Sequence, residues 1–238
     1  MQYLYRRSDI PNEEKLLFRS VFGRFRSSSN IDNLERLRSI EHYVTKIGGD
    51  NAGNLSENYE RIRERNEEGK KQLVVVSAIR SSGSFGEFRH ESIGKLVPKE
   101  KETKGFNTTS HLIAIAKLLQ QSDCQSATSV ADSIEGFTKA ILTREVEGVF
   151  LTTLSEVVCT GLSPLREEIE NYDSSVDDIV EIGSDWLIRK EDGRIFSIAG
   201  VGEMIAADVY QKYFELKNLN SMSVDLGEDM YDTAFQED

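Results

Sequence analysis

Small polar residues that could bind an anion gather at three places in the sequence, each after a predicted strand or at the start of a predicted helix. They are residues 23–29, 77–83 and 200–203, which together are rich in glycine and serine. In an open α/β sheet, ligands bind beyond the carboxyl ends of parallel strands, where helix N-termini offer free backbone N–H groups to anions. The pattern predicts a site for an anionic small molecule. Ordinary turns are the alternative, because Gly and Ser make turns in any α/β protein.

The elements that would position these residues begin with a strand, a helix and a second strand. The apolar run LLFRSVF, residues 16–22, precedes Gly23 and predicts a short buried strand. Apolar residues at helical spacing over 31–47 predict a helix that the following glycine pair ends. Three successive valines within 72–79 predict a strand buried on both faces, as in a parallel sheet. Together these elements predict a βαβ unit.

The middle of the chain is predicted as a loop followed by helices. Residues 80–107 are rich in glycine, serine and charge, which predicts a long surface loop that is either a functional lid or a disordered insertion. Asn107 or Thr108 then caps a helix with an apolar face. Residues 126–182 are predicted to be mainly helical, with Ser163-Pro164 as the cap and first turn of one helix.

The last third of the chain predicts a hairpin, a helix and a strand. Asp192-Gly193 favours a tight turn between the two apolar stretches of residues 185–198, and Trp186 is expected to anchor this hairpin by packing. The glycines at 200 and 202 open a helix that runs to residue 219, and SMSVDL, residues 221–226, predicts a third buried strand. The whole pattern is that of a mixed α/β protein.

Charge and composition exclude several classes of protein. The chain has 238 residues and a net charge of −12, so it repels phosphate backbones and non-specific nucleic-acid binding is not expected. No run of about 18 apolar residues predicts a membrane span, and the N-terminus has no apolar signal core. Cys124 and Cys159 do not form a disulfide framework or a zinc site, and the three histidines have no ligand spacing, so no metal site is predicted. A cytoplasmic location follows as the expectation.

Three segments, in order, resemble one family. KQLVVVSAIRSS with GFNTTSHL is similar to a strand of the aspartate kinases, closest to fungal forms that read VVVCSARSS and GTTSRLL. IAGVGEMIAADVYQKYFELKNLNSMSVDL resembles the family's S-x-G-E-x-L-S helix and the strand that ends in Val-Asp. SVFGRFRSSSNIDNLERLRSIEHYV is aligned with the family's K-F-G-G-T-S-V turn and its helix. The chain therefore resembles a degenerate, truncated N-terminal half of an aspartate kinase of the amino-acid kinase superfamily.

This resemblance implies a fold, a domain plan and a reaction. The fold would be a three-layer α/β/α arrangement with a mainly parallel sheet, incomplete here and interrupted by the helical segment 126–182. The partial kinase domain would span 16–226, after an N-terminal extension over 1–15 and before an acidic tail over 227–238. The family reaction converts ATP and L-aspartate to 4-phospho-L-aspartate, the first step of the branch that leads to homoserine, threonine and methionine.

The resemblance also implies roles for three residues in substrate binding. Glu203 would hold the amino group of aspartate, because an ammonium pairs naturally with a carboxylate. Ser77 and Thr109 would face the substrate carboxylates or the phosphate. The structural alternatives are a serine at a strand end, a threonine in a helix cap and a first-turn glutamate that complements the helix dipole. His111 stands where fungal forms have arginine and is predicted to lie on the helix surface.

The phosphate turn departs from the family pattern in this alignment. The family lysine corresponds to Val21, and the turn residues are Gly23, Arg24 and Arg26. The arginines could supply charge, but from a different direction. No segment in the 238 residues resembles the family's T-L-G-R-G-G-S-D nucleotide-binding stretch, so MgATP is implied only by the family, and no cofactor is predicted for this chain alone.

Two interpretations follow. In the first, the chain is an aspartate kinase relative that is inactive alone because the phosphate-turn lysine and the nucleotide half are missing. In the second, it is a non-catalytic relative that binds a ligand or a partner, or a fragment of a full-length kinase. The predicted partners are L-aspartate and a full-length homologue or an oligomer, with neither nucleic acid nor membrane.

Overall fold

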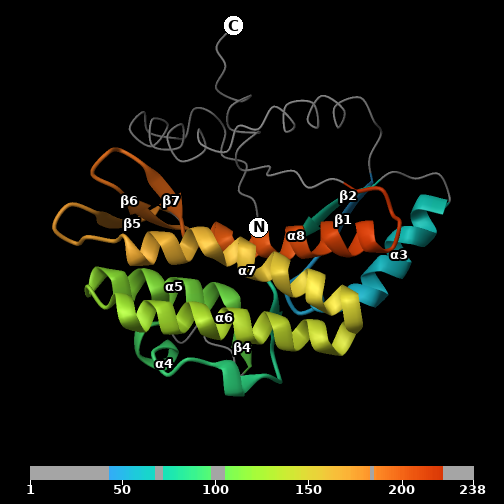
Figure 1. Cartoon of the computed structure of the whole chain (residues 1–238), viewed down its shortest axis with the longest axis horizontal. Helices are drawn as coiled ribbons and strands as arrows, with labels where there is room; N and C mark the ends of the chain where they lie inside the picture. The colour runs from blue at the N-terminus through green and yellow to red at the C-terminus, as the bar shows by residue number, and fades with distance from the viewer. Residues whose placement is uncertain (1–42, 68–71, 98–104, 183–184, 222–238) are drawn as a thin grey trace, which may run out of the picture.

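Four helices form the main body of the protein, and three small sheets lie around them (Figure 1). The computed structural model describes residues 43–67, 72–97, 105–182 and 185–221. This part of the chain is a mixed α/β structure, which confirms the predicted class at that level. The predicted strand 16–22, the extension 1–15 and the acidic tail 227–238 lie outside the described residues, as does all but the first residue of the predicted strand 221–226.

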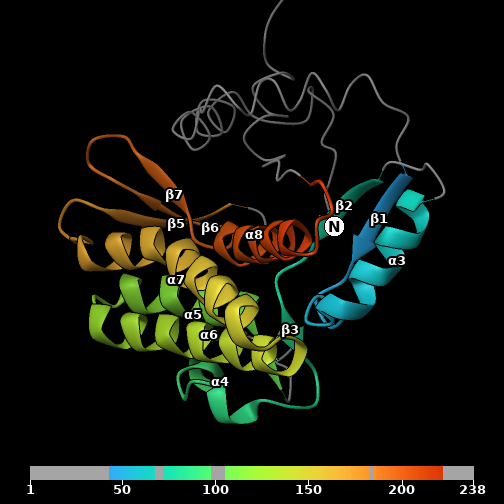
Figure 2. The same cartoon turned by 45° about the vertical axis from the view of Figure 1, so that its right-hand side comes forward.

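A βαβ unit opens the described chain, although it is built from other residues than the sequence suggests. Strand β1 (Tyr43–Ile47) and strand β2 (Gln72–Val76) pair in parallel, and helix α3 (Leu55–Glu67) connects them (Figure 2). The helix predicted over 31–47 is therefore wrong at its end, since 43–47 is a strand. YVTKI fits a strand as well as a helix, and pairing with the Val-rich β2 decides the outcome.

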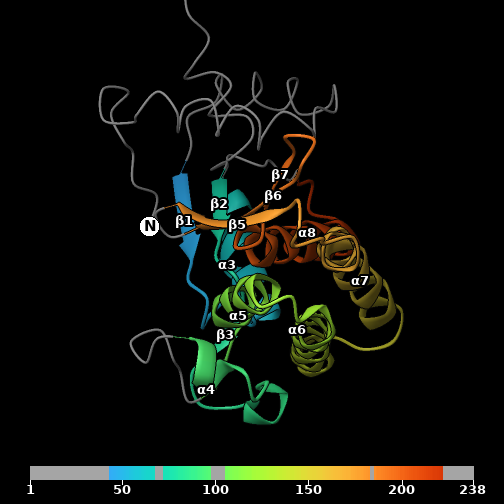
Figure 3. The same ribbon diagram turned by 90° about the vertical axis from the view of Figure 1, so that its left-hand side faces the viewer.

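Helices α5 (Thr108–Gln120), α6 (Cys124–Glu145) and α7 (Gly148–Glu170) follow one another through short connections, and α8 (Gly200–Leu216) packs against α7 (Figure 3). Two of these helices begin at side-chain caps. Asn107 accepts a hydrogen bond from the Ser110 N–H at 3.3 Å, and Asp123 accepts one from the Ser126 N–H at 3.0 Å. Each cap satisfies a backbone N–H that the helix itself cannot. The predicted cap at Asn107 is confirmed.

Aliphatic side chains from all four helices make one core, to which α7 contributes one buried face. Leu154, Val158 and Leu162 of α7 are fully buried. Gly161 lets α7 approach α8 closely, because a Cβ there would lie 2.8 Å from Cγ1 of Ile205. Pro164 does not begin a helix, as the sequence suggested, but lies inside α7. Burial of the apolar face on both sides of the proline holds the two halves in one helix despite the missing N–H.

Helix α7 is also the one described helix whose length and apolar composition would suffice to cross a membrane. In the structure it packs along one side against α6 and along the other against α8. Six of its residues are buried in the core, on one face of the helix. This packing is compatible with a water-soluble protein.

A three-stranded antiparallel sheet lies at one end of the helical body. It consists of β5 (Asp178–Ile182), β6 (Asp185–Arg189) and β7 (Ile195–Ser197), in that order. The β6–β7 hairpin turns at Asp192-Gly193, where Gly193 has a φ of 81°, and this confirms the predicted turn. Strand β5 corrects the prediction that the helical segment extends to residue 182. Trp186 of β6 is 7% exposed, in agreement with its predicted packing role.

The segment between β2 and α5 is anchored to the core, in contrast to the surface loop predicted over 80–107. Its described residues form the short pair β3 (Arg80–Ser81) and β4 (Phe106–Asn107), a 3-10 turn (Gly86–Phe88) and helix α4 (Ile93–Leu96). Isolated apolar side chains hold it in place. Phe85, Ile93 and Phe106 are each at most 5% exposed, and both phenylalanines contact the ring of Phe137 on α6.

Candidate functional site

The end of β2 and the N-termini of α5 and α8 meet around one glycine. A Cβ on Gly202 would lie 2.9 Å from Cγ2 of Thr108, 3.0 Å from Cβ of Ala78 and 3.2 Å from Cδ1 of Leu112. These four residues define the Gly202 junction. Any larger side chain at position 202 would push the start of α8 away from α5 and β2. Glycine is therefore what allows the three elements to converge.

Hydrogen bonds fix the strand and the helix at this junction. The Thr108 hydroxyl donates to the Ile79 carbonyl at 2.5 Å, and Thr108 is 3% exposed. The Ser77 N–H donates to the Ile47 carbonyl at 3.0 Å, which continues the pairing of β1 and β2 by one residue. The chain just beyond β2 is thereby held between β1 and the first turn of α5. Side-chain bonds of this kind make the arrangement specific because a buried carbonyl left unpaired is costly.

The three predicted substrate-binding residues are each the immediate neighbour of a residue in the Gly202 junction. Ser77 precedes Ala78, Thr109 follows Thr108, and Glu203 follows Gly202. Thr109 and Glu203 are exposed and Ser77 is half-buried. The structure therefore brings together the three segments that carry these residues, which are far apart in the sequence. Helices α5 and α8, 13 and 17 residues long, both direct their N-termini to this point.

A second turn lies beside the junction, formed by residues 48–51 directly after β1, and is called the glycine turn here. Gly49 approaches the chain after β2 so closely that a Cβ would lie 2.7 Å from the Ala78 carbonyl oxygen. The Arg80 N–H donates to the Gly49 carbonyl at 3.1 Å, and the Asn51 N–H donates to the Gly48 carbonyl at 2.9 Å. The carboxyl ends of both parallel strands thus open onto the same place.

Sequence reasoning missed the glycine turn because it took the two glycines as the stop signal of a helix. The signal was present, since residues 46–49 read K-I-G-G, very close to the K-F-G-G that opens the family's phosphate turn. Val21, Gly23, Arg24 and Arg26, the residues first assigned to that turn, lie outside the described residues. Lys46, at the end of β1, is exposed.

Asp50 connects the glycine turn to the segment that follows β2. Its Oδ2 accepts from Nε of Arg80 at 3.0 Å and pairs with the terminal guanidinium nitrogen at 2.8 Å. Its Oδ1 accepts from the Ser82 hydroxyl at 2.8 Å. Both oxygens of the carboxylate are thus occupied by donors from one short segment, although both charged side chains remain partly exposed, at 40% and 47%.

Helix α8 is tied to the glycine turn by a buried tyrosine. The Tyr210 hydroxyl donates to the Ala52 carbonyl at 3.0 Å and accepts from the Asn58 amide at 2.6 Å. Burial raises the pKa of Tyr210 far above its usual value, although the Asn58 hydrogen bond opposes this, so the phenol is neutral at any physiological pH. The contact fixes α8 relative to β1 as well as to β2 and α5.

His111 lies buried in the first turn of α5 and is not the surface residue that the sequence suggested. It is 1% exposed, and its ring stacks on Phe106 with 3.9 Å between the ring centroids. Its Nδ1 lies 2.8 Å from the Asn107 carbonyl, and its Nε2 accepts from the His90 N–H at 3.3 Å. Burial lowers the pKa of His111 to about 4, against the opposing Asn107 hydrogen bond, so the ring is neutral at pH 7.

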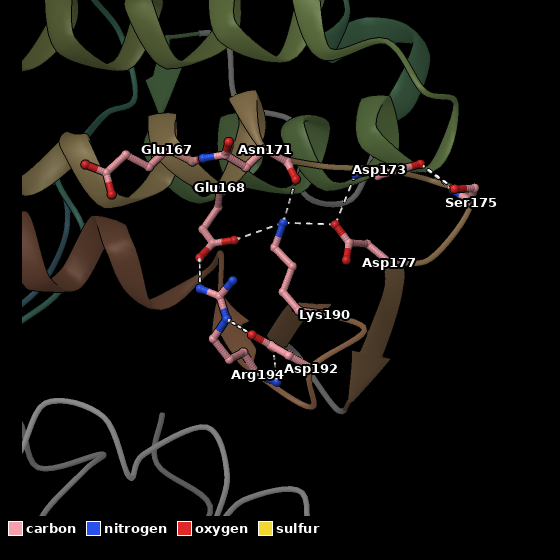
Figure 4. A network of polar contacts seen from close by, with 9 residues as sticks. All are labelled: Glu167, Glu168, Asn171, Asp173, Ser175, Asp177, Lys190, Asp192 and Arg194. Carbon is pink, nitrogen blue, oxygen red and sulfur yellow. Dashed lines mark hydrogen bonds and ion pairs between the residues drawn. The ribbon is translucent and has the colours of Figure 1, made fainter.

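A separate polar cluster surrounds Lys190 at the far end of α7, and a cavity of about 300 Å³ lies beside it (Figure 4). Lys190 is 7% exposed, and its Nζ lies 2.9 Å from Asp177, 3.2 Å from Glu168 and 3.0 Å from the Asn171 carbonyl. Burial alone would raise the pKa of Asp177, but hydrogen bonds from Asp173 and Lys190 keep it below its usual value. Lys190 and Arg194 together pair with Asp177 and Glu168, so this Lys190 cluster joins the hairpin to α7 as a structural contact.

Comparison of the chain with protein-family models, with curated proteins and with solved structures found no match. The family resemblance therefore rests on the residues and motifs alone.

Proposed function

We propose that this protein is an aspartate kinase-like protein that binds L-aspartate at the Gly202 junction. The observation that supports the proposal is the convergence of the chain after β2 and two helix N-termini on Gly202, because Ser77, Thr109 and Glu203 lie on these three segments. A three-layer kinase-like arrangement and action in the cytoplasm are parts of the same proposal.

The chemistry of the junction suits a small amino acid with two carboxylates. A helix N-terminus attracts a carboxylate through its dipole, and two helices of sufficient length begin here. The Ser110 N–H of α5 and the Gly200 N–H of α8 are already bonded to Asn107 and Ser197, so a carboxylate would use the remaining N–H groups of each first turn. Glu203, exposed in the first turn of α8, supplies the opposite charge for an ammonium group. L-aspartate carries two carboxylates and one ammonium, so its charges are the complement of these three features.

We also propose that the phosphate turn is the glycine turn after β1 and not the sequence around Gly23. In that position Lys46 corresponds to the family lysine, and the two glycines that follow let the backbone approach a ligand. The turn adjoins the Gly202 junction through the contact of Gly49 with Ala78. In this alignment the phosphate-turn lysine is not missing, because Lys46 takes its place. The feature of the turn that opposes phosphoryl transfer is then the negative charge of Asp50.

Isothermal titration calorimetry of the whole chain with L-aspartate tests the proposal. We expect saturable binding that weakens about tenfold or more in Glu203→Gln, because a charge-assisted hydrogen bond contributes about 1.5–3 kcal/mol. Succinate, which has the two carboxylates without the ammonium group, should bind the wild-type chain more weakly than aspartate does. In Glu203→Gln this preference for aspartate should disappear.

The matched control is Glu215→Gln, which removes the same charge from the other end of the same helix. Glu215 is exposed and pairs with Lys212, so aspartate affinity should not change in this variant. Absence of saturable aspartate binding to the wild-type chain would refute the proposed function. Equal affinity of the two glutamine variants would remove Glu203 from the site.

A further inference from the structure

Asp50 sits in the glycine turn where a bound phosphate would require positive charge and free donors. The two nitrogens of Arg80 and the hydroxyl of Ser82 all point their hydrogens at its carboxylate. A guanidinium and a hydroxyl held side by side are groups that proteins commonly use to bind phosphate oxygens. In this chain an internal carboxylate takes their hydrogen bonds.

The space next to this contact remains open. A Cβ built on Gly48 would meet nothing within 4 Å, whereas one on Gly49 would strike the Ala78 carbonyl. An anion could therefore approach the turn at Gly48 without steric hindrance. What opposes it is charge, since Asp50 carries a negative charge one residue beyond the glycine pair and neutralises the guanidinium of Arg80.

We propose that Asp50 is a specificity-determining residue that excludes phosphate groups from the glycine turn by occupying Arg80 and Ser82 with its own carboxylate. This inference rests on the proposed function only in taking the glycine turn as part of the ligand site. It makes the site selective for a free amino acid over a nucleotide or a phosphorylated amino acid. Replacing Asp50 by a neutral residue would remove both the ion pair that holds Arg80 and the repulsion toward an anion in one step.

Calorimetric titration of the full chain with inorganic pyrophosphate at low ionic strength tests this inference. The wild-type chain should show no saturable binding. Asp50→Asn, which keeps the shape of the side chain, should bind pyrophosphate at least about tenfold more tightly than the wild-type limit, a gain expected for a partly screened charge. Raising the salt concentration should reduce the gain.

Three further variants make the result specific. Asp50→Thr should show the same gain, and the double variant Asp50→Asn with Arg80→Ala should lose it. Glu57→Gln removes one exposed charge from α3 in the same βαβ unit without touching the turn, and it should bind no pyrophosphate. Thermal melting of each variant establishes that it is folded.

Pyrophosphate binding to the wild-type chain, or no gain in both folded Asp50 variants, would overturn the inference. A gain that persists without Arg80 would also overturn it, because the freed donors would then not be the cause. Aspartate titration of the same samples distinguishes failure of this inference about Asp50 from failure of the proposed function. That function fails if the wild-type chain does not bind aspartate, whatever pyrophosphate does.

Discussion

Replacing Gly202 by alanine should loosen the junction on which the proposed site depends. The added methyl group would lie within 3.2 Å of three atoms that cannot easily move. Ala78 has no side-chain torsion with which to relieve the contact, Thr108 is held by its hydrogen bond to Ile79, and Leu112 is fully buried. The start of α8 must therefore shift, and Glu203 must shift with it.

The expected magnitude combines two opposing effects. Overpacking by one methyl group in a packed core costs about 1–3 kcal/mol. Alanine recovers up to about 1 kcal/mol through its higher helix propensity, and less at the first turn than in a helix interior. We expect a net loss of about 1–2 kcal/mol in the free energy of unfolding. For a chain of this size the melting temperature should fall by roughly 2–8 °C.

Differential scanning calorimetry and aspartate titration of Gly202→Ala together test this reasoning. The matched control is Gly83→Ala, because a Cβ on Gly83 would meet no atom within 4 Å and the backbone there does not require glycine. The control should keep both its melting temperature and its aspartate affinity. A Gly202→Ala protein as stable as the wild type, with unchanged aspartate affinity, would refute the proposed role of the close contact.

Three other predictions concern buried polar groups. Since the pKa of His111 is about 4 in the folded chain and about 6.5 in the unfolded chain, stability should fall as the pH drops from about 6.5 to 4, by up to about 3 kcal/mol. His111→Gln should lose that part of the pH dependence in urea unfolding at pH 5 and pH 7. Lys190→Met should cost about 3–5 kcal/mol in the same assay, because it leaves a buried carboxylate unpaired, whereas Arg194→Met at the exposed edge of the cluster should change little. Thr108→Val should cost about 1–3 kcal/mol by leaving the Ile79 carbonyl without its donor, and an unchanged unfolding midpoint would contradict this.

Local sequence signals predicted some elements well. The Asp192-Gly193 turn and the cap at Asn107 depend on chemistry within a few residues, and both are confirmed. The run of valines in β2 correctly indicated parallel pairing, but the strand is half-buried along its length and not buried on both faces, because its described sheet has two strands. For the turn and the cap, the interactions that select the structure lie almost entirely within the segment itself.

Other features depend on contacts between distant segments, and the sequence alone could not decide them. Tyr43, Val44 and Ile47 satisfy both helical and strand spacing, and only pairing with β2 makes this stretch a strand. Phe85 stands alone among polar residues, and its burial requires Phe137 from α6. The glycine pair after β1 has the pattern of a helix stop only as long as residues 43–47 are taken as a helix.

The candidate site shows the same division. Ser77, Thr109 and Glu203 were selected from motifs, and the structure brings the segments that carry them together through Gly202. The close contact itself left no mark in the sequence apart from a glycine in a helix. Nothing in the sequence distinguishes Asp50, because its significance depends on Arg80, which is 30 residues away.

The most direct test of the proposed site is to map aspartate binding residue by residue. Backbone amide chemical shifts of the isotope-labelled chain should be recorded while L-aspartate is added. We expect the shifts to change in a saturable manner at residues 77–79, 108–110 and 200–203, the three segments that meet at the junction, and at residues 48–50 of the adjoining glycine turn. Changes confined to the Lys190 cluster, or none in these segments at saturating aspartate, would contradict the account.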